Sequence, residues 1–180
     1  MYGMVNKAVE EMVLAAHGAP VWREIKTRAG IVDDVFISNE AYADDITYRL
    51  VGAASEVLKL PADKILHAFG EHWVLNTARQ GYGHMMRAGG KTLGEFLVNL
   101  PSFHDRVALL YPNLVPPHFE VTHREERSLR LHYKSHRPGL TPFVGGLISG
   151  LGQMFGTPAR WKLETAKVDG GDHDVFFVEW

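Results

Sequence analysis

The stretch "LHYKSHRPGL", from Leu131 to Leu140, determines how the second half of this sequence is interpreted. If it is an extended strand, successive side chains alternate between two faces. One face then carries, in chain order, Leu129, Leu131, Tyr133, Ser135 and Arg137. The other face carries charged residues and histidines, namely Arg130, His132, Lys134 and His136. The first face therefore turns inward, and its polar end needs partners, because buried polar and charged groups are costly without them.

The polar end of this strand suits an acidic ligand. Tyr133 and Ser135 can donate O–H bonds, and Arg137 offers a planar fork that matches carboxylate or phosphate. Pro138 disfavours helical backbone at the residue before it, so we expect the strand to continue through Arg137. One interpretation is a carboxylated ligand held along this face. The alternative is a strand end that emerges into solvent, where polarity is normal, and the Y-x-S-x-R pattern alone does not separate the two.

Composition narrows the classes of protein. The chain has 180 residues, the size of one domain, and is 46% hydrophobic and 22% charged, with a net charge of −2. This balance gives no sign of nucleic-acid or membrane-surface binding. Cysteine is absent from the sequence, which excludes disulfides and thiolate chemistry. No signal peptide or membrane-span pattern is visible, so we expect a cytoplasmic protein.

Helical periodicity dominates the first half of the chain. We expect helices over residues 5–16, 19–30, 40–60 and 62–81, ended by Gly18, Gly30, Pro61 and Gly81. A turn should follow over residues 84–90, and then either two helices or one bent helix over 92–112. In the two-helix case Asn99 would cap the second helix, with Pro101 in its first turn.

The second half changes to strand periodicity. Residues 118–137 read as a hairpin whose turn is "REER", and residues 159–170 and 172–180 read as a closing strand pair. The helix expected between them, over residues 141–156, contains several glycines, which indicates that another element packs closely against its backbone. The predicted fold class is α+β, with a helical half, then a four-stranded antiparallel sheet with one helix inserted.

One histidine stands apart from the others. A single helical face carries Leu97, Leu100, His104, Val107 and Tyr111, so His104 should point into the core. It is either a core histidine with a satisfied hydrogen bond, or an imidazole ligand to a metal in an apolar pocket, as heme iron requires. Nothing nearby supplies the further ligands of a zinc site.

The segment "PPHF", residues 116–119, follows shortly after. It is a rigid connector between helix and strand. A proline ring there would also form a stiff wall against a flat ligand.

These motifs together resemble a known family. The inward His104, the Pro-Pro connector and Tyr133-x-Ser135-x-Arg137 occur in the order found in the heme nitric-oxide/oxygen-binding (H-NOX) domain, which is related to the heme domain of soluble guanylate cyclase. The resemblance covers nearly the whole chain, through "MYGMVNKAVEEM", "AFGEHWV", "NLPSFHDRV" and "GDHDVFFVEW". It implies one H-NOX domain over 1–180, with a helical subdomain of about 1–60, a heme-bearing subdomain of about 61–180, and heme b between them.

The resemblance also implies roles for individual residues. His104 matches the proximal iron ligand, and Tyr133, Ser135 and Arg137 match the residues that hold the heme propionates. Pro117 matches a proline that distorts the porphyrin. A carboxylate of the helical half, best matched by Asp44 with Asp45 as the alternative, would pair with Arg137 across the subdomain boundary. Both aspartates could equally lie in a solvated helix turn.

The distal side should decide which gas binds. Oxygen-binding members of the family carry a tyrosine that donates a hydrogen bond to the bound ligand. Phe143 matches that position and donates nothing, and its neighbours Pro142 and Val144 would not donate either if the alignment shifts by one residue. Trp73 matches a further polar position and could donate from its indole N–H. Additional candidates for the pocket wall, which could equally be plain core residues, are Val5, Val9, Val74 and Leu147.

The function implied is a stand-alone ferrous-heme sensor that binds NO and CO but not O2 stably. NO would release His104 and shift the helical half, and a separate histidine kinase or cyclic-di-GMP enzyme would respond. The domain itself is not expected to be an enzyme. Alternatives that stay open are a heme peroxidase or NO dioxygenase, which would need a distal acid–base residue, an O2-binding H-NOX domain, and a non-heme module that binds another dianion.

Overall fold

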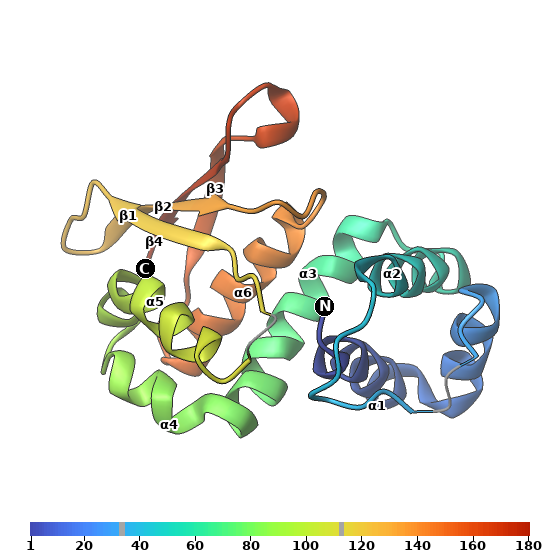
Figure 1. Ribbon diagram of the computed structural model, residues 1–180. Helices are drawn as coiled ribbons and strands as arrows, with labels where there is room; N and C mark the ends of the chain where they lie inside the picture. Colours follow the sequence, from blue (N-terminus) through green and yellow to red (C-terminus); the bar gives the residue numbers. More distant parts are fainter. Residues whose placement is uncertain (33–34, 112–113) are drawn as a thin grey trace.

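The computed structural model describes residues 1–32, 35–111 and 114–180, and it has two lobes (Figure 1). The smaller lobe is helical, and the larger combines helices with a sheet. The helices are α1 (Gly3–Arg28), α2 (Asp44–Leu58), α3 (Ala62–His72), η1 (Trp73–Ala78), α4 (Arg79–Gly89), α5 (Leu93–Ala108), α6 (Thr141–Met154) and η2 (Lys167–Asp169). The strands are β1 (His118–Thr122), β2 (Ser128–Lys134), β3 (Arg160–Thr165) and β4 (Asp174–Glu179). No helix among these described residues is long and apolar enough to cross a membrane.

The sheet confirms the predicted α+β class. It is four-stranded, with the order β1-β2-β4-β3 and antiparallel pairing between neighbours. Leu129, Leu131 and Tyr133 are buried on the inner face, where each is at most 6% exposed. Helices α5 and α6 lie against that face (Figure 1), so the alternation in the sequence correctly identified the inward side.

The strand prediction was wrong at its end. β2 stops at Lys134, before Ser135 and Arg137. The Ser135 hydroxyl accepts a hydrogen bond from the backbone N–H of Arg137 at 3.1 Å, and Gly139 adopts a positive φ of 72°. A local side-chain-to-backbone bond of this kind competes with ladder pairing, so the chain turns where the alternation suggested it would continue.

Two predicted helices in the first half are continuous with their neighbours. The predicted stop at Gly18 is a kink inside α1, where this glycine has φ 79° and ψ 173°. The predicted stop at Gly81 and the turn over residues 84–90 are wrong. A π-helical segment, η1, joins α3 to α4, which runs to Gly89. Met86 on α4 is only 3% exposed, so tertiary packing overrides the weak helix propensity of the glycines.

Helix boundaries also differ around α2 and α5. The third helix starts at Asp44 instead of residue 40, because Ala41 pairs with Tyr2 in an isolated bridge. α5 is one helix with Pro101 inside it, and Thr92 caps its start by accepting from the N–H of Glu95 at 3.2 Å. Asn99 is no cap, because it donates to the carbonyl of Gly89. The predicted end of this region at residue 112 lies outside the described residues.

The glycines of α6 let it pack directly against α3. A Cβ atom on Gly146 would collide with the carbonyl oxygen of His67, and one on Gly70 would collide with that of Phe143. This close approach confirms the prediction that another element packs against the α6 backbone.

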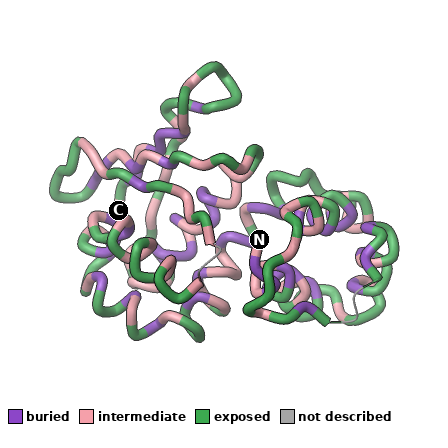
Figure 2. Tube along the Cα trace, viewed as in Figure 1, coloured by how far each residue is buried: buried purple, intermediate pink, exposed green. Residues whose placement is uncertain are grey.

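Two buried clusters form the core (Figure 2). One joins α1, α2 and the first part of α3, and the other lies between the sheet, α4, α5 and α6. Helix α3 and the η1 segment that continues it therefore link the two lobes.

We predict that Gly146→Ala destabilises the protein by about 1–3 kcal/mol, because the added methyl group meets backbone that cannot rotate away. The matched control is Gly52→Ala in α2, where the same methyl group meets nothing within 4 Å. That variant should gain roughly 0.5–1 kcal/mol of helix stability. Urea unfolding curves of both variants measure the difference. Equal midpoints would show that the α3–α6 contact is looser than described.

Candidate functional site

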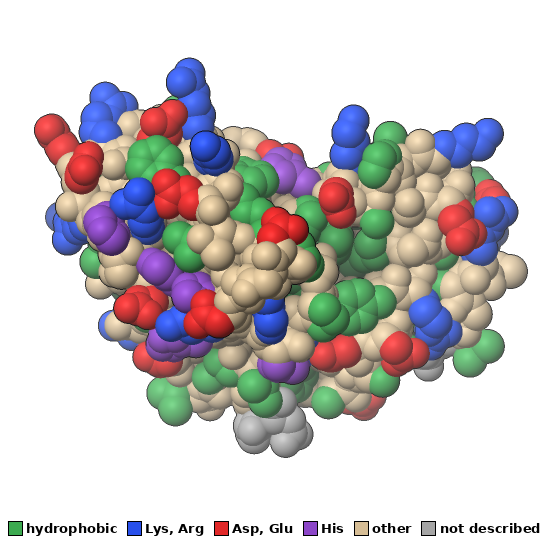
Figure 3. All heavy atoms as spheres, turned by 90° about the horizontal axis from the view of Figure 1, so that it is seen from above, with side chains coloured by type: hydrophobic (Ala, Val, Ile, Leu, Met, Phe, Trp, Pro, Cys, Tyr) green, Lys and Arg blue, Asp and Glu red, His purple; other side chains and the backbone are tan. Residues whose placement is uncertain are grey.

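A deep cavity lies where the two lobes meet. The cavity volume is about 220 Å³. By the same measure a single water molecule needs only about 10–15 Å³, so the cavity has room for a large ligand. Seen from above, the surface is hollowed between the lobes (Figure 3). Residues of both lobes line the cavity, and most are apolar, so it suits a large and mainly hydrophobic ligand.

His104 projects from α5 into this cavity. Its Nδ1 lies 3.1 Å from the carbonyl oxygen of Leu100. A carbonyl only accepts, so Nδ1 carries the proton and Nε2 has the lone pair that a metal ligand needs. Burial lowers the pKa of His104, which keeps the ring neutral near pH 7. The ring packs against Phe119, with centroids 4.8 Å apart.

One end of the cavity is polar, unlike the mainly apolar walls. Tyr133, Ser135 and Arg137 line it together. Burial raises the pKa of the Tyr133 phenol, so its O–H is retained as a donor. The loop after β2 brings Arg137 to the same cavity although strand geometry ends before it. The sequence therefore grouped these residues correctly but for a partly wrong reason.

Arg137 also joins the two lobes. Its Nε lies 2.7 Å from Oδ2 of Asp44, and its Nη1 donates to the carbonyl of Val115 at 3.1 Å. The amino group of Met1 contacts the same carboxylate. Burial works to raise the pKa of Asp44, but the Met1 amino group and Arg137 outweigh it and lower that pKa. Asp45 pairs instead with Arg49 of its own helix at 3.1 Å, so the structure selects Asp44 of the two aspartates.

A second contact between the lobes was missed by the sequence analysis. The hydroxyl of Tyr48 in α2 donates to the carbonyl of Pro138 at 2.9 Å, and Tyr48 lines the cavity. A tyrosine one helical turn after Asp44 points the same way as that aspartate, and this spacing was the available signal.

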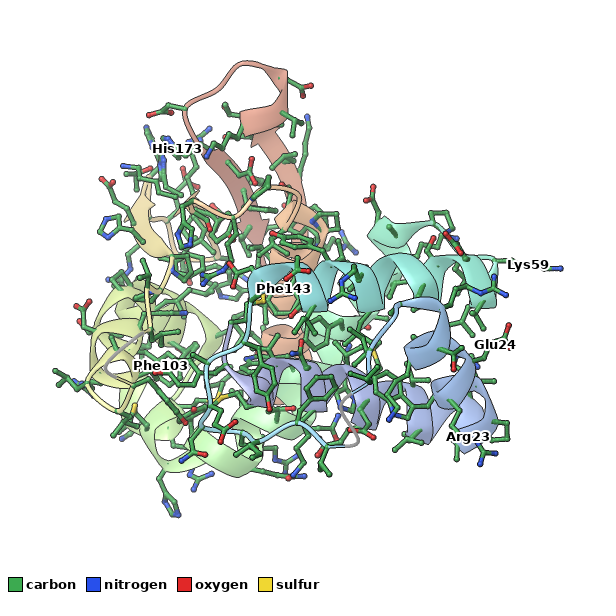
Figure 4. All side chains as sticks on the ribbon, turned by 45° about the vertical axis from the view of Figure 1, so that its right-hand side comes forward. Arg23, Glu24, Lys59, Phe103, Phe143 and His173 are labelled. Atoms are coloured by element: carbon green, nitrogen blue, oxygen red, sulfur yellow. The ribbon has the colours of Figure 1, made fainter. Side chains whose placement is uncertain are left out.

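Most of the predicted wall residues line the cavity. Pro117, Phe143, Trp73, Val5 and Leu147 all contribute to it. Figure 4 shows Phe143 near the centre of the molecule and Phe103, another lining residue, on the side of α5.

Two predicted wall residues do not line this cavity. Val9 is fully buried in the core of the helical lobe, where α1 packs on its neighbours. Val74 lines a smaller adjoining cavity of about 70 Å³, which His104 also borders. Neither position could be separated from plain core packing by sequence alone.

A pair of tyrosines in the cavity wall was also missed. The hydroxyls of Tyr82 and Tyr111 lie 2.6 Å apart, and Tyr82 also donates to the sulfur of Met4 at 3.4 Å. Burial and the bond with Tyr111 raise the pKa of Tyr82. The two hydroxyls form a hydrogen bond with each other, and Tyr82 forms a second one with Met4. Their polar groups are therefore paired inside a mainly apolar wall.

The residues fit a heme as the ligand. In the described part of the chain, no group of three or more His, Asp or Glu side chains could hold a metal ion by itself. A neutral histidine, apolar walls and a hydroxyl-and-arginine end match an iron porphyrin with two carboxylates.

The fold and this site define an α+β domain with a large interlobe pocket and one inward histidine. Comparison with known proteins identifies the class: the model of the haem-NO-binding family matches residues 2–163. The chain therefore belongs to the haem-NO-binding (H-NOX) family. Domains of this family bind heme and are related to the NO sensors of the soluble guanylate cyclases.

Relatives and solved structures agree. The chain is 27% identical to soluble guanylate cyclase gcy-31 and 33% identical to soluble guanylate cyclase gcy-37, both of Caenorhabditis elegans, over 85% and 82% of its length. It spans 22% and 21% of those two relatives. The crystal structure of an H-NOX protein from S. oneidensis in the Fe(II)NO state has a TM-score of 0.89 at 24% identity, covering 99% of this chain and 98% of that one. This likeness confirms the fold.

Proposed function

We propose that the chain binds heme b in the interlobe cavity and senses NO. The observation that carries the proposal is the neutral His104 ring, fixed by Leu100 and facing an apolar cavity whose far end offers Tyr133, Ser135 and Arg137. Titration of the heme-free protein with hemin tests it. One equivalent per chain should bind, and binding without a defined stoichiometry would contradict the proposal.

When bound, heme would supply an iron that can take NO or CO. The chain provides the surroundings. His104 would be the protein ligand, and Tyr133, Ser135 and Arg137 would hold the two propionates. Pro117 would contact the porphyrin. The apolar walls exclude water from the ligand, which favours a neutral diatomic gas over ions.

The signal depends on how the lobes are joined. We place the boundary near residue 60, with the helical subdomain before it. The Asp44–Arg137 pair and the Tyr48–Pro138 bond cross from one lobe to the other, and Arg137 also serves the ligand. His104 would tie α5 to the heme, and weakening of that bond on NO binding would remove the tie. A ligand shifts such an equilibrium only through its different affinity for the two states.

A second protein would respond to this shift, and we propose a histidine kinase or a cyclic-di-GMP enzyme. Coupling between sites is typically about 1–3 kcal/mol, so partner activity should change by roughly 5–150-fold between the two heme states. The assay compares partner activity with reduced protein, NO-treated protein and His104→Gly protein. The variant should behave like the NO-treated form. Agreement with the NO-free form would mean that histidine release is not the signal.

We predict that air leaves the reduced protein without the absorption bands of a dioxygen complex, whereas NO and CO change its spectrum. Bound O2 carries partial negative charge and is stabilised by a hydrogen-bond donor, and Phe143 in the wall offers none. Phe143→Tyr adds a donor and should slow O2 dissociation. Phe143→Leu is the matched control, because it changes the wall without adding a donor. A stable dioxygen spectrum in the unaltered protein would contradict the prediction and would make Trp73 the first donor to test.

A further inference from the structure

The carboxylate-binding end of the cavity has an arginine that is already engaged. Arg137 has five N–H donors, and two of its nitrogen atoms donate to Asp44 and to Val115. Its charge faces the Asp44 carboxylate, which the Met1 amino group also contacts, so these three groups together leave one net positive charge for a ligand with two carboxylates. A second cation near Tyr133 and Ser135 would complete the site.

Lys167 lies beside this end of the cavity, although it is not one of the residues that line it. Its Nζ donates to the carbonyl oxygen of Ser135 at 3.0 Å, and Ser135 lines the cavity. An ammonium group has three donors, so two remain for a ligand. Among the described residues, no carboxylate forms an ion pair with the Lys167 ammonium group, whose hydrogen-bond partner is the Ser135 carbonyl.

The backbone of Lys167 is fixed although its side chain is exposed. Its N–H donates to Oδ1 of Asp174 at 2.8 Å, and Oδ2 of the same carboxylate accepts from the Thr141 hydroxyl at 2.6 Å. Asp174 is only 4% exposed. A buried carboxylate therefore anchors the start of the β3–β4 loop to the first turn of α6, and this holds the lysine beside Ser135.

We infer that Lys167 binds one of the two ligand carboxylates, while Arg137 binds the other. The inference rests on the proposed heme function and adds a residue from β3–β4 to the carboxylate site. The lysine reaches the ligand by moving its ammonium group from the Ser135 carbonyl toward the cavity mouth, which its flexible four-carbon stem allows.

The experiment measures the rate of heme transfer from the reconstituted protein to excess apomyoglobin. Lys167→Gln should transfer hemin about two- to fivefold faster at low salt, because exposed ion pairs contribute modestly. The difference should vanish near 1 M salt, where screening acts within about 3 Å. Lys167→Arg should restore the slow rate. Lys162→Gln, an exposed change on the outer face of β3, is the matched control and should transfer like the unaltered protein.

The dimethyl ester of hemin separates a carboxylate contact from a change in the loop. Its carboxylates are methylated, so Lys167→Gln and the unaltered protein should release it at the same rate. Two results would overturn the inference. One is that Lys167→Gln speeds the transfer of hemin and of the ester equally, and the other is that it does not speed the transfer of hemin at low salt. If the unaltered protein binds neither porphyrin, the proposed heme function itself fails, and that outcome is seen before any variant is tested.

Discussion

His104→Gly protein should lose the absorption spectrum of the native reduced protein, and imidazole added to the medium should restore it. Glycine removes the side chain that faces the cavity and leaves a space of imidazole size on α5. Free imidazole can then occupy the place of the ring and supply the same nitrogen. The expected effect is complete, because in the described part of the cavity wall no other histidine is present to replace it.

The control for this change is His84→Gly. His84 is exposed on α4, so its replacement carries the same cost of a glycine inside a helix, roughly 1 kcal/mol, without touching the cavity. Its spectrum should match that of the unaltered protein. A native reduced spectrum in the His104→Gly protein without imidazole would show that another residue is the ligand.

Arg137→Ala should lose heme roughly 10- to 100-fold faster than the unaltered protein. A charge-assisted hydrogen bond is worth about 1.5–3 kcal/mol, and the change removes the guanidinium that faces the ligand carboxylate. Tyr133→Phe removes one neutral donor and should accelerate loss by only about fivefold. Ser135→Ala removes a donor and also the acceptor of the Arg137 N–H, and its effect should lie between those of Tyr133→Phe and Arg137→Ala. Heme transfer to apomyoglobin measures all three rates.

Two further variants separate the ligand contact of Arg137 from its structural contact. Arg130→Ala removes an arginine from the outer face of β2, where it pairs with Glu164, and should leave heme loss unchanged. Asp44→Asn breaks the ion pair between the lobes but leaves the guanidinium in place. Faster heme loss in Asp44→Asn equal to that of Arg137→Ala would show that the arginine acts by joining the lobes and not by holding a carboxylate.

Sequence patterns predicted the sheet and much of the site because alternation and helical spacing report burial directly. Leu129 and Leu131 proved to be inward, and His104 lines the cavity as the apolar face of α5 suggested. The position of Arg137 was predicted from strand geometry, yet a hydroxyl-to-backbone bond at Ser135 turns the chain and brings it there. A short local bond of this kind leaves no periodic signal.

The features of the site that could not be predicted from the sequence depend on contacts between distant segments. The hydroxyls of Tyr82 on α4 and Tyr111 after α5 meet across two helices, and α4 continues past Gly81 with Met86 buried against the core. Lys167 reaches Ser135 because Asp174 anchors its backbone from across the β3–β4 loop. The low helix propensity of glycine does not indicate the contact between the two tyrosines. The sequence around an exposed lysine does not indicate its contact with Ser135.

The most direct test of the central claim is the anaerobic absorption spectrum of the reduced protein, recorded before and after NO. The account predicts a heme spectrum that depends on His104 and that NO changes. In His104→Gly protein supplemented with imidazole, the addition of NO should cause the same change. A colourless purified protein that stays colourless with added hemin, or a heme spectrum that NO does not change, would contradict it.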